Sequence, residues 1–188
     1  MKTLTLSLCA LLLISCNFHE VDPGKLYRSN QLTGKQFSKA IEKLGIKTII
    51  NLRGESPTKE WYQEESQVAE EYGVELINIK MRASHIPTKE NLIKLLESFE
   101  SAERPILIHC QAGADRTGEA TAIYQMEYMG KSKKEALKML TPRYLHLKKK
   151  YPAKRYFFKR YEGVEWAYNE YDPCSDEWEM FPKDLYCN

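Results

Sequence analysis

The sequence has no strong excess of charge, no internal repeat and no low-complexity segment. Its 28 lysines and arginines stand against 26 aspartates and glutamates, a formal net charge of +2, so composition gives no general case for nucleic acid as a partner. It also lacks an apolar run long enough to cross a membrane: residues 4–14 would span only about 16 Å as a helix, against a bilayer core of about 30 Å. With 188 residues, 43% of them hydrophobic, the chain predicts one well-buried domain.

The short apolar run is typical of a signal peptide. Lys2 precedes it and Ser15-Cys16 closes it, so residues 1–15 are interpreted as a leader rather than a membrane span. The sequence Leu-Ile-Ser-Cys also resembles the lipobox of bacterial lipoproteins, in which the cysteine is lipidated and becomes the first mature residue. The resemblance implies an exported protein, lipid-anchored at Cys16 on the periplasmic or outer-membrane side. An ordinary cleaved signal that contains a cysteine is the alternative.

Cysteine is scarce, with five in the chain. Cys9 and Cys16 lie in or next to the leader, and Cys110 lies in the central motif described below. The remaining two, Cys174 and Cys187, would meet an oxidising compartment in an exported protein. A disulfide between them is one prediction, and two free thiols are the alternative.

The most informative stretch is residues 105–118, PILIHCQAGADRTG. Residues 106–108 are apolar and two of them are β-branched isoleucines, as in a strand buried on both faces of a parallel sheet. Cys110 therefore emerges at the carboxyl edge of a sheet, where α/β proteins bind ligands. Residues 111–115 include two alanines and one glycine, so the backbone can curl and turn its N–H groups inward around an anion.

A helical pattern begins directly after this loop. Ala120, Ile123 and Tyr124 recur at helix spacing, so the loop lies at a helix N-terminus, which carries a partial positive charge. Arg116 adds a guanidinium that can bind two oxygens of a phosphate. Helix N-termini and nearby cations can lower a cysteine pKa to about 3.5–7.5, so the motif predicts a nucleophilic thiolate beside an anion site. A buried cysteine followed by an ordinary turn is the structural alternative.

The segment HCQAGADRTG resembles the HCxxGxxR(S/T)G signature of the cysteine-dependent protein tyrosine and dual-specificity phosphatases. The resemblance implies a phosphomonoester hydrolase that needs no metal or other cofactor, with Cys110 as the nucleophile that forms a cysteinyl-phosphate. Arg116 would bind the phosphate oxygens, Thr117 would assist departure of the cysteine, and His109 would fix the loop by hydrogen bonds rather than transfer protons. The loop backbone that contributes to substrate binding comprises Gln111, Ala112, Gly113 and Ala114.

The sequence departs from the common family pattern at the general acid. Many relatives carry an aspartate on a loop roughly thirty residues before the cysteine, but here that loop, residues 80–87, has no carboxylate. Asp115 is the best substitute, because a subset of bacterial tyrosine phosphatases and some phosphoinositide phosphatases carry an aspartate directly before the signature arginine. Those relatives often have lysine where this chain has Ala114, which weakens a phosphoinositide preference. A structural role for Asp115 is the alternative, and His85 is the second candidate acid.

Capping signals predict where two helices begin. Thr33 with Gln36, and Ser132 with Glu135, each form a capping-box pattern. Gly45 is expected to end the helix that begins at Thr33.

Strand and helix patterns alternate along the rest of the chain. Strands are expected over residues 25–29, 46–52, 74–79 and 106–108, the first at an edge of the sheet, with helices between them. The fold class is therefore α/β, a central mostly parallel sheet flanked by helices, similar to dual-specificity phosphatases. We expect a leader (1–15), a tether (16–24), a phosphatase domain (25–161) and an acidic tail (162–188) that a disulfide could staple.

Charge is distributed unevenly near the C-terminus. Residues 141–161 hold eight basic residues and no acid, and residues 162–184 hold eight acids and one lysine. The basic segment is either a surface for anionic substrates or lipid headgroups, or a solvated face paired with the acidic tail, and the local balance of charge favours the second. Arg28 and Arg53, each near a strand end, could line the pocket mouth.

The expected partners are a phosphorylated protein or a small phosphomonoester, and a membrane through the lipid anchor. Two functional alternatives remain open. One is a phosphatase for inositol phosphates or phosphoinositides, and the other is a lipoprotein that binds anionic ligands without turnover. No oligomeric state is predicted.

Overall fold

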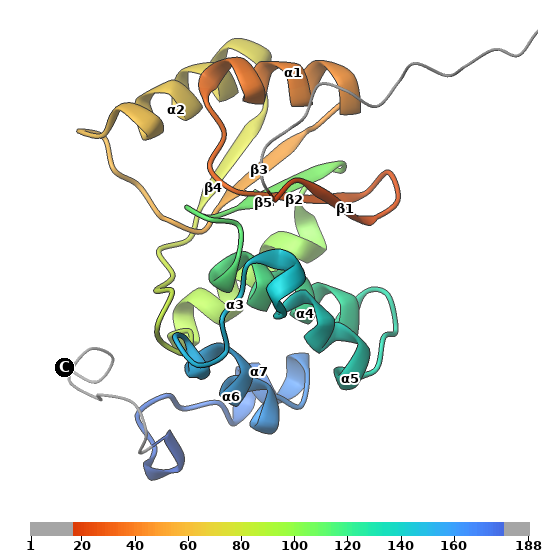
Figure 1. Cartoon of the computed structure of the whole chain (residues 1–188), viewed down its shortest axis with the longest axis vertical. Coiled ribbons are helices and arrows are strands. Elements are labelled where there is room, and N and C mark those ends of the chain that lie inside the picture. The colour runs from red at the N-terminus through yellow and green to blue at the C-terminus, as the bar shows by residue number, and fades with distance from the viewer. Residues whose placement is uncertain (1–16, 179–188) are drawn as a thin grey trace, which may run out of the picture.

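The computed structural model describes residues 17–178, and a five-stranded sheet forms its middle layer (Figure 1). The strand order is β1-β2-β5-β3-β4. The strands are β1 (His19–Asp22), β2 (Leu26–Ser29), β3 (Thr48–Asn51), β4 (Glu75–Asn78) and β5 (Ile106–His109).

Strand β5 occupies the centre of this sheet. It pairs in parallel with β2 on one side and with β3 on the other, and β3 pairs in parallel with β4. All four residues of β5 are buried, as expected for an apolar strand covered on both faces. The carboxyl ends of β2, β5, β3 and β4 therefore lie at one edge of the sheet, which is the expected arrangement of an α/β fold.

Helices cover both faces of the sheet. Figure 1 shows α1 (Gly34–Leu44) and α2 (Glu60–Tyr72) on one face and the remaining helices on the other. The second group comprises α3 (Lys89–Ser101), α4 (Asp115–Glu127), α5 (Lys133–Ala136), α6 (Pro152–Arg160) and α7 (Val164–Asn169), with short 3-10 turns η1 (Leu137–Met139), η2 (Pro142–Tyr144) and η3 (Asp176–Trp178).

Local signals determine where the helices begin and end. Thr33 and Gln36 form a capping box at the start of α1, and Ser132 and Glu135 form another at the start of α5. Helix α1 ends at Gly45 in the left-handed region, where glycine carries no Cβ penalty. Both capping boxes and the stop at Gly45 agree with the sequence prediction.

Each face of the sheet has its own hydrophobic core. The core under α1 and α2 includes Phe37, Ile49 and Leu107. The larger core on the other face includes Ile108, Phe99 and Tyr124 and extends to the C-terminal aromatic residues. Both cores are formed by residues between 18 and 178, so the chain from Asn17 onward contains the folded unit.

The segment expected to be a tether is part of the sheet. Residues His19–Asp22 form β1, which pairs antiparallel with β2 and takes the edge position that we had expected for residues 25–29. The side chain of Asn17 is already buried. Residues 23–25 supply the reversal, in which Gly24 has φ +68° and Lys25 N–H donates to Asp22 O. A turn this short between two four-residue strands left only a weak sequence signal.

The described part of the expected acidic tail, residues 162–178, packs into the larger core. Ala167, Tyr171 and Trp178 are each at most 1% exposed. Trp178 stacks on Phe157 of α6 with ring centroids 6.2 Å apart, and Tyr171 donates its hydroxyl to Pro87 O. The acids of this segment lie on its exposed side, so its net charge gave no indication of the apolar face.

The basic segment divides into paired and unpaired cations. Lys154 is fully buried and lies 2.6 Å from Glu119 of α4. Arg160 pairs with Glu177 at 2.9 Å, an ion pair of the kind expected between the two charged segments. Lys148, Lys149 and Lys150 are exposed, as a solvated face requires. The buried Lys154 does not fit that expectation, which therefore describes only part of the segment.

No helix within residues 17–178 is both long and apolar enough to cross a bilayer. The predicted leader (1–15) and the predicted lipidation site, Cys16, lie outside the described residues.

Candidate active site

The loop that joins β5 to α4 is shaped by two glycines. Gly113 has φ +65°, and a Cβ at this position would lie 2.6 Å from Ser29 O, so only glycine fits against β2. Gly118, in the first turn of α4, lies so close to η1 that a Cβ would come within 2.8 Å of Met139 O. Gly113 and Gly118 thus permit close packing of α4 and of the loop of residues 110–114, which we call the catalytic loop.

Cys110 is the first residue after β5, and its side chain is buried, with 2% of the residue exposed. Burial raises the pKa of the thiol, but the charge of Arg116, the Thr117 hydroxyl and the backbone N–H groups of Thr117 and Gly113 lower it, and the net pKa is below its ordinary value. The thiolate is favoured because donors and a cation surround the sulfur. The surroundings of Cys110 therefore suit the predicted role of an activated nucleophile in an anion-binding loop.

Arg116 lies in the first turn of α4 beside this thiol. Its Nη1 lies 3.4 Å from Leu52 O and 3.5 Å from Met81 O, which orients the guanidinium through long contacts from two other loops. Among residues 17–178, its Nε has no hydrogen-bond partner. The guanidinium therefore keeps donors for a bound anion, as the phosphate-binding role requires.

His109 is held below the loop by a network that starts at Glu65 of α2. Its Nε2 lies 2.7 Å from Glu65 Oε1, and both side chains are fully buried. Gln31 donates to the other oxygen of Glu65 and accepts a hydrogen bond from Arg53. This geometry suits the predicted role of His109 in fixing the loop, because its Nε2 atom is already paired with Glu65 on the α2 side of the sheet.

Asp115 is the first residue of α4, and it is paired. Its Oδ1 lies 2.7 Å from Nδ1 of His146, a fully buried residue of the segment between η2 and α6. Nε2 of His146 is also buried and has no hydrogen-bond partner among residues 17–178. The contact joins the catalytic loop to the basic segment, so Asp115 has the structural partner that the alternative interpretation requires and also a group that can orient it as an acid.

His146 was missed from the sequence. It is one histidine in a run of basic residues, 31 positions after Asp115, and no spacing rule connects the two. A histidine between two leucines, Leu145 and Leu147, is the only sequence feature that distinguishes it.

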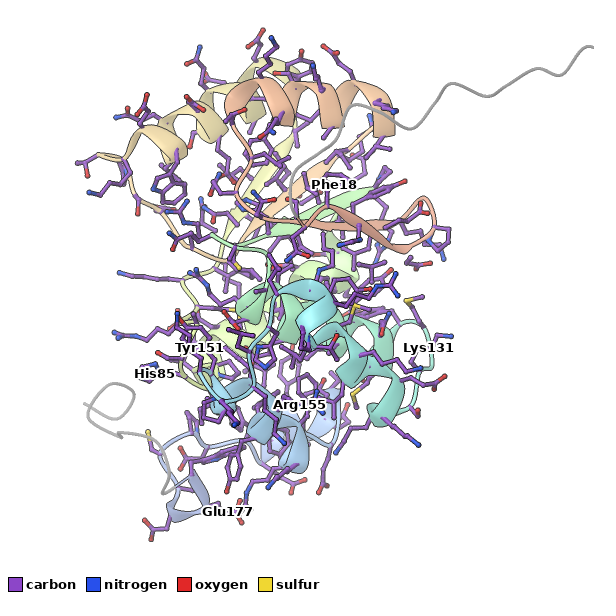
Figure 2. The ribbon with its side chains drawn as sticks, in the orientation of Figure 1. Phe18, His85, Lys131, Tyr151, Arg155 and Glu177 are labelled. Carbon is purple, nitrogen blue, oxygen red and sulfur yellow. The ribbon has the colours of Figure 1, made fainter. Side chains whose placement is uncertain are left out.

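The loop of residues 80–87, where many relatives carry the acid, presents cations instead. Lys80 and Arg82 are exposed, and Met81 supplies the carbonyl near Arg116. His85, the second candidate acid, lies on this loop, away from the sheet (Figure 2), and its Nδ1 lies 2.8 Å from Ser84 Oγ. The structure thus brings Asp115, not a carboxylate of this loop, next to the signature arginine.

Of the two arginines expected at the pocket mouth, only Arg53 is close to the surface. Its guanidinium lies 3.3 Å from the centre of the Trp61 ring, and burial and the nearby charge of Arg116 lower its pKa. Arg28 was misplaced by the sequence prediction, because β2 is an inner strand and its side chain points into the core. There it donates to Gly113 O, lies over the Tyr144 ring, and has its pKa lowered by burial to about 10.

The other predicted residues to be placed are Thr117 and the two cysteines of the possible disulfide. Thr117 is fully buried. Cys174 is disulfide-bonded, and its predicted partner Cys187 lies outside the described residues. Within residues 17–178, no three metal-ligating side chains gather in one place.

A cysteine whose pKa is lowered and an arginine, held by a glycine loop at the carboxyl edge of a parallel sheet, define a cysteine-dependent phosphatase domain of the tyrosine and dual-specificity class. The family described as "DSP-PTPase phosphatase fused to NAD+ Kinase" matches residues 17–155, and the chain belongs to this family.

Two curated relatives are dual-specificity protein phosphatases. The chain is 29% identical over 131 residues to Mpk3 of Drosophila melanogaster, covering 66% of this chain and 29% of the relative. It is 27% identical over 125 residues to TpbA of Pseudomonas aeruginosa, covering 65% and 52%. The chain thus spans about half or less of the length of these relatives.

Solved structures share the fold. The core catalytic domain of the PP-IP phosphatase SIW14 from S. cerevisiae superposes with a TM-score of 0.66 at 26% identity, covering 79% of this chain and 87% of that one. TpbA of P. aeruginosa superposes with a TM-score of 0.60 at 20% identity, covering 78% and 90%. The second likeness concerns the fold alone.

Proposed function

We propose that this protein hydrolyses phosphomonoesters without a metal, through a cysteinyl-phosphate intermediate. The observation that carries the proposal is the environment of Cys110, where Arg116, Thr117 and loop N–H groups lower the pKa of the thiol. The same donors that stabilise a thiolate can bind a phosphate dianion above it.

The reaction has two steps. In the first, the Cys110 sulfur attacks phosphorus, the bond from phosphorus to the leaving oxygen breaks, and Asp115 gives its proton to that oxygen. In the second, water gives a proton to the Asp115 carboxylate and attacks phosphorus, and the P–S bond breaks with its electron pair returning to sulfur. Arg116 and the loop N–H groups bind the equatorial oxygens throughout, and the Thr117 hydroxyl stabilises the departing thiolate.

His146 contributes by holding Asp115. With Nδ1 of His146 on Oδ1, the second carboxyl oxygen is left to face the substrate. His146 is therefore a positioning residue in this proposal, and the alternative acid is His85.

Asp115→Asn is expected to slow hydrolysis of phenyl phosphate, whose leaving oxygen needs a proton, by about 10²–10³-fold. The loss in kcat/KM on p-nitrophenyl phosphate, which reports the first step, is expected to be much smaller, because that leaving group departs as an anion. His146→Ala should show the same dependence on the leaving group, with a loss of about tenfold in kcat and little change in KM.

His85→Ala serves as the matched comparison and should leave both rates unchanged. If Asp115→Asn slows neither substrate, or if His85→Ala reproduces the leaving-group dependence, the assignment of the acid is wrong.

The proposed substrates are phosphorylated proteins. TpbA, a relative at 27% identity, is named a dual-specificity protein phosphatase, and a P. aeruginosa TpbA structure is a complex with pTyr. A polyphosphorylated substrate is the second candidate, since Arg53, Lys80 and Arg82 surround the site with cations and SIW14 is titled a PP-IP phosphatase.

The proposal is tested with the chain from Asn17 onward. It should release phosphate from p-nitrophenyl phosphate at a rate that EDTA does not change. A panel of phosphotyrosine peptide, phosphoserine peptide and inositol hexakisphosphate then separates the two substrate classes. Absence of turnover at every pH between about 5 and 8 would favour the alternative of an anion-binding lipoprotein.

We also propose that the chain is exported and lipid-anchored at Cys16. The Leu-Ile-Ser-Cys sequence after an apolar stretch supports this proposal. Cys16→Ser should move the expressed protein from the membrane fraction to the soluble fraction, and retention in the membrane fraction would argue against lipidation.

A further inference from the structure

The loop between η2 and α6, residues 145–150, exposes the two most accessible large hydrophobic side chains of the described chain. Leu145 is 52% exposed and Leu147 is 55% exposed. Between them, His146 is fully buried against Asp115. We call residues 145–150 the basic loop, since three lysines complete it.

The backbone of this loop is arranged so that the leucines point outward. Leu145 has φ +65°, and among residues 17–178 it is the one non-glycine residue at positive φ. Residues other than glycine rarely adopt this conformation, because their Cβ lies close to the following carbonyl oxygen. The conformation is retained because His146 anchors the loop from within, which leaves the residues before and after it on the outside.

Lys148, Lys149 and Lys150 follow directly and are all exposed. No described carboxylate forms a salt bridge with any of them, in contrast to Lys154 and Arg160 of the same segment, which are paired. The basic loop therefore presents exposed leucines beside a cluster of cations, a combination typical of segments that bind an anionic membrane surface.

The first residue that the structure describes, Asn17, lies at the same place. Asn17 is 1% exposed, and its Nδ2 donates to Tyr144 O and to Ala112 O, at 3.0 Å in both cases. Tyr144 is the residue before Leu145, and Ala112 belongs to the catalytic loop. Cys16 directly precedes Asn17 in the sequence, so the proposed lipidation would attach a lipid one residue away from these contacts.

We propose that the basic loop is a membrane contact, with Leu145 and Leu147 inserted among the headgroups of an anionic bilayer and the three lysines bound to headgroup phosphates. The inference goes beyond the proposed activity and uses the proposed lipidation only to argue for a bilayer over an acidic protein partner. It orients the molecule with the catalytic loop facing the membrane, so the phosphatase reaches phosphate groups held at the membrane surface. Figure 2 places Tyr151, directly after the loop, on the half of the molecule that carries α3 to α7.

The test uses the chain from Asn17 onward and sedimentation with vesicles of phosphatidylcholine, with or without phosphatidylglycerol. Wild type should bind only the anionic vesicles. Lys148→Gln, Lys149→Gln and Lys150→Gln together should weaken binding on the order of 100-fold, about fivefold for each lysine. Leu145→Ser with Leu147→Ser should weaken binding several-fold at unchanged charge.

The matched control removes the same charge from the opposite layer, with Lys35→Gln, Lys39→Gln and Lys43→Gln on the exposed side of α1. It should bind vesicles like wild type. Equal losses in the control and the loop variant, no loss in the loop variant, or no binding by wild type would each overturn the proposal. Hydrolysis of p-nitrophenyl phosphate by every variant is measured in parallel, so an inactive protein that binds vesicles, which would refute only the proposed function, is distinguished from an active one that does not.

Discussion

Cys110→Ser is expected to reduce phosphate release from p-nitrophenyl phosphate by at least about 10⁴-fold. The hydroxyl of serine is not ionised by the donors that lower the pKa of the thiol, so the attacking group is lost. The measurement is steady-state release of p-nitrophenol at neutral pH.

The anion site should survive this change, because it is made of Arg116 and backbone N–H groups. Inorganic phosphate or tungstate should therefore bind Cys110→Ser, as measured by calorimetry, and the circular dichroism spectrum should match that of wild type. A Cys110→Ser variant that folds and hydrolyses substrate at a rate near wild type would show that another group is the nucleophile.

Arg116→Lys is expected to lower kcat/KM by about 10³-fold even though the positive charge is kept. Lysine has a single side-chain nitrogen, so it cannot bind two phosphate oxygens in parallel while a second nitrogen contacts Leu52 O and Met81 O. The measurement is kcat/KM on p-nitrophenyl phosphate.

Arg82→Lys provides the matched control, since Arg82 is an exposed cation on the loop of residues 80–87. That variant should differ from wild type by less than about threefold, within the usual effect of a surface substitution. A loss of less than about threefold in both variants would mean that Arg116 acts through its charge alone.

The parts of the structure that the sequence predicted are those with a local cause. An apolar run predicted β5, capping residues predicted the starts of α1 and α5, and Gly45 predicted the end of α1. The catalytic loop is also local, because nucleophile, glycine and arginine lie within seven consecutive residues.

The parts that escaped prediction depend on contacts between distant segments. The pairing of Asp115 with His146 and the burial of Lys154 against Glu119 arise because the chain after α4 folds back over that helix. In a run of eight cations, nothing marks which lysine is buried. Burial raises the pKa of Glu119, and the charge of Lys154 opposes the rise.

Two other differences have the same origin. Arg28 was expected at the pocket mouth, but β1 occupies the sheet edge and makes β2 an inner strand, so the arginine points into the core and supports Gly113. Trp178 and Tyr171 were read as parts of an acidic tail, yet their rings complete the core around Phe157.

The most direct test of the account is rapid quenching of the enzyme during turnover of p-nitrophenyl phosphate, followed by mass spectrometry of its peptides. A cysteinyl-phosphate at Cys110 is expected, with accumulation increased in Asp115→Asn because its second step lacks a base. Phosphate on a different residue, or turnover with no phosphorylated enzyme in either protein, would contradict the central claim that Cys110 carries the phosphoryl group.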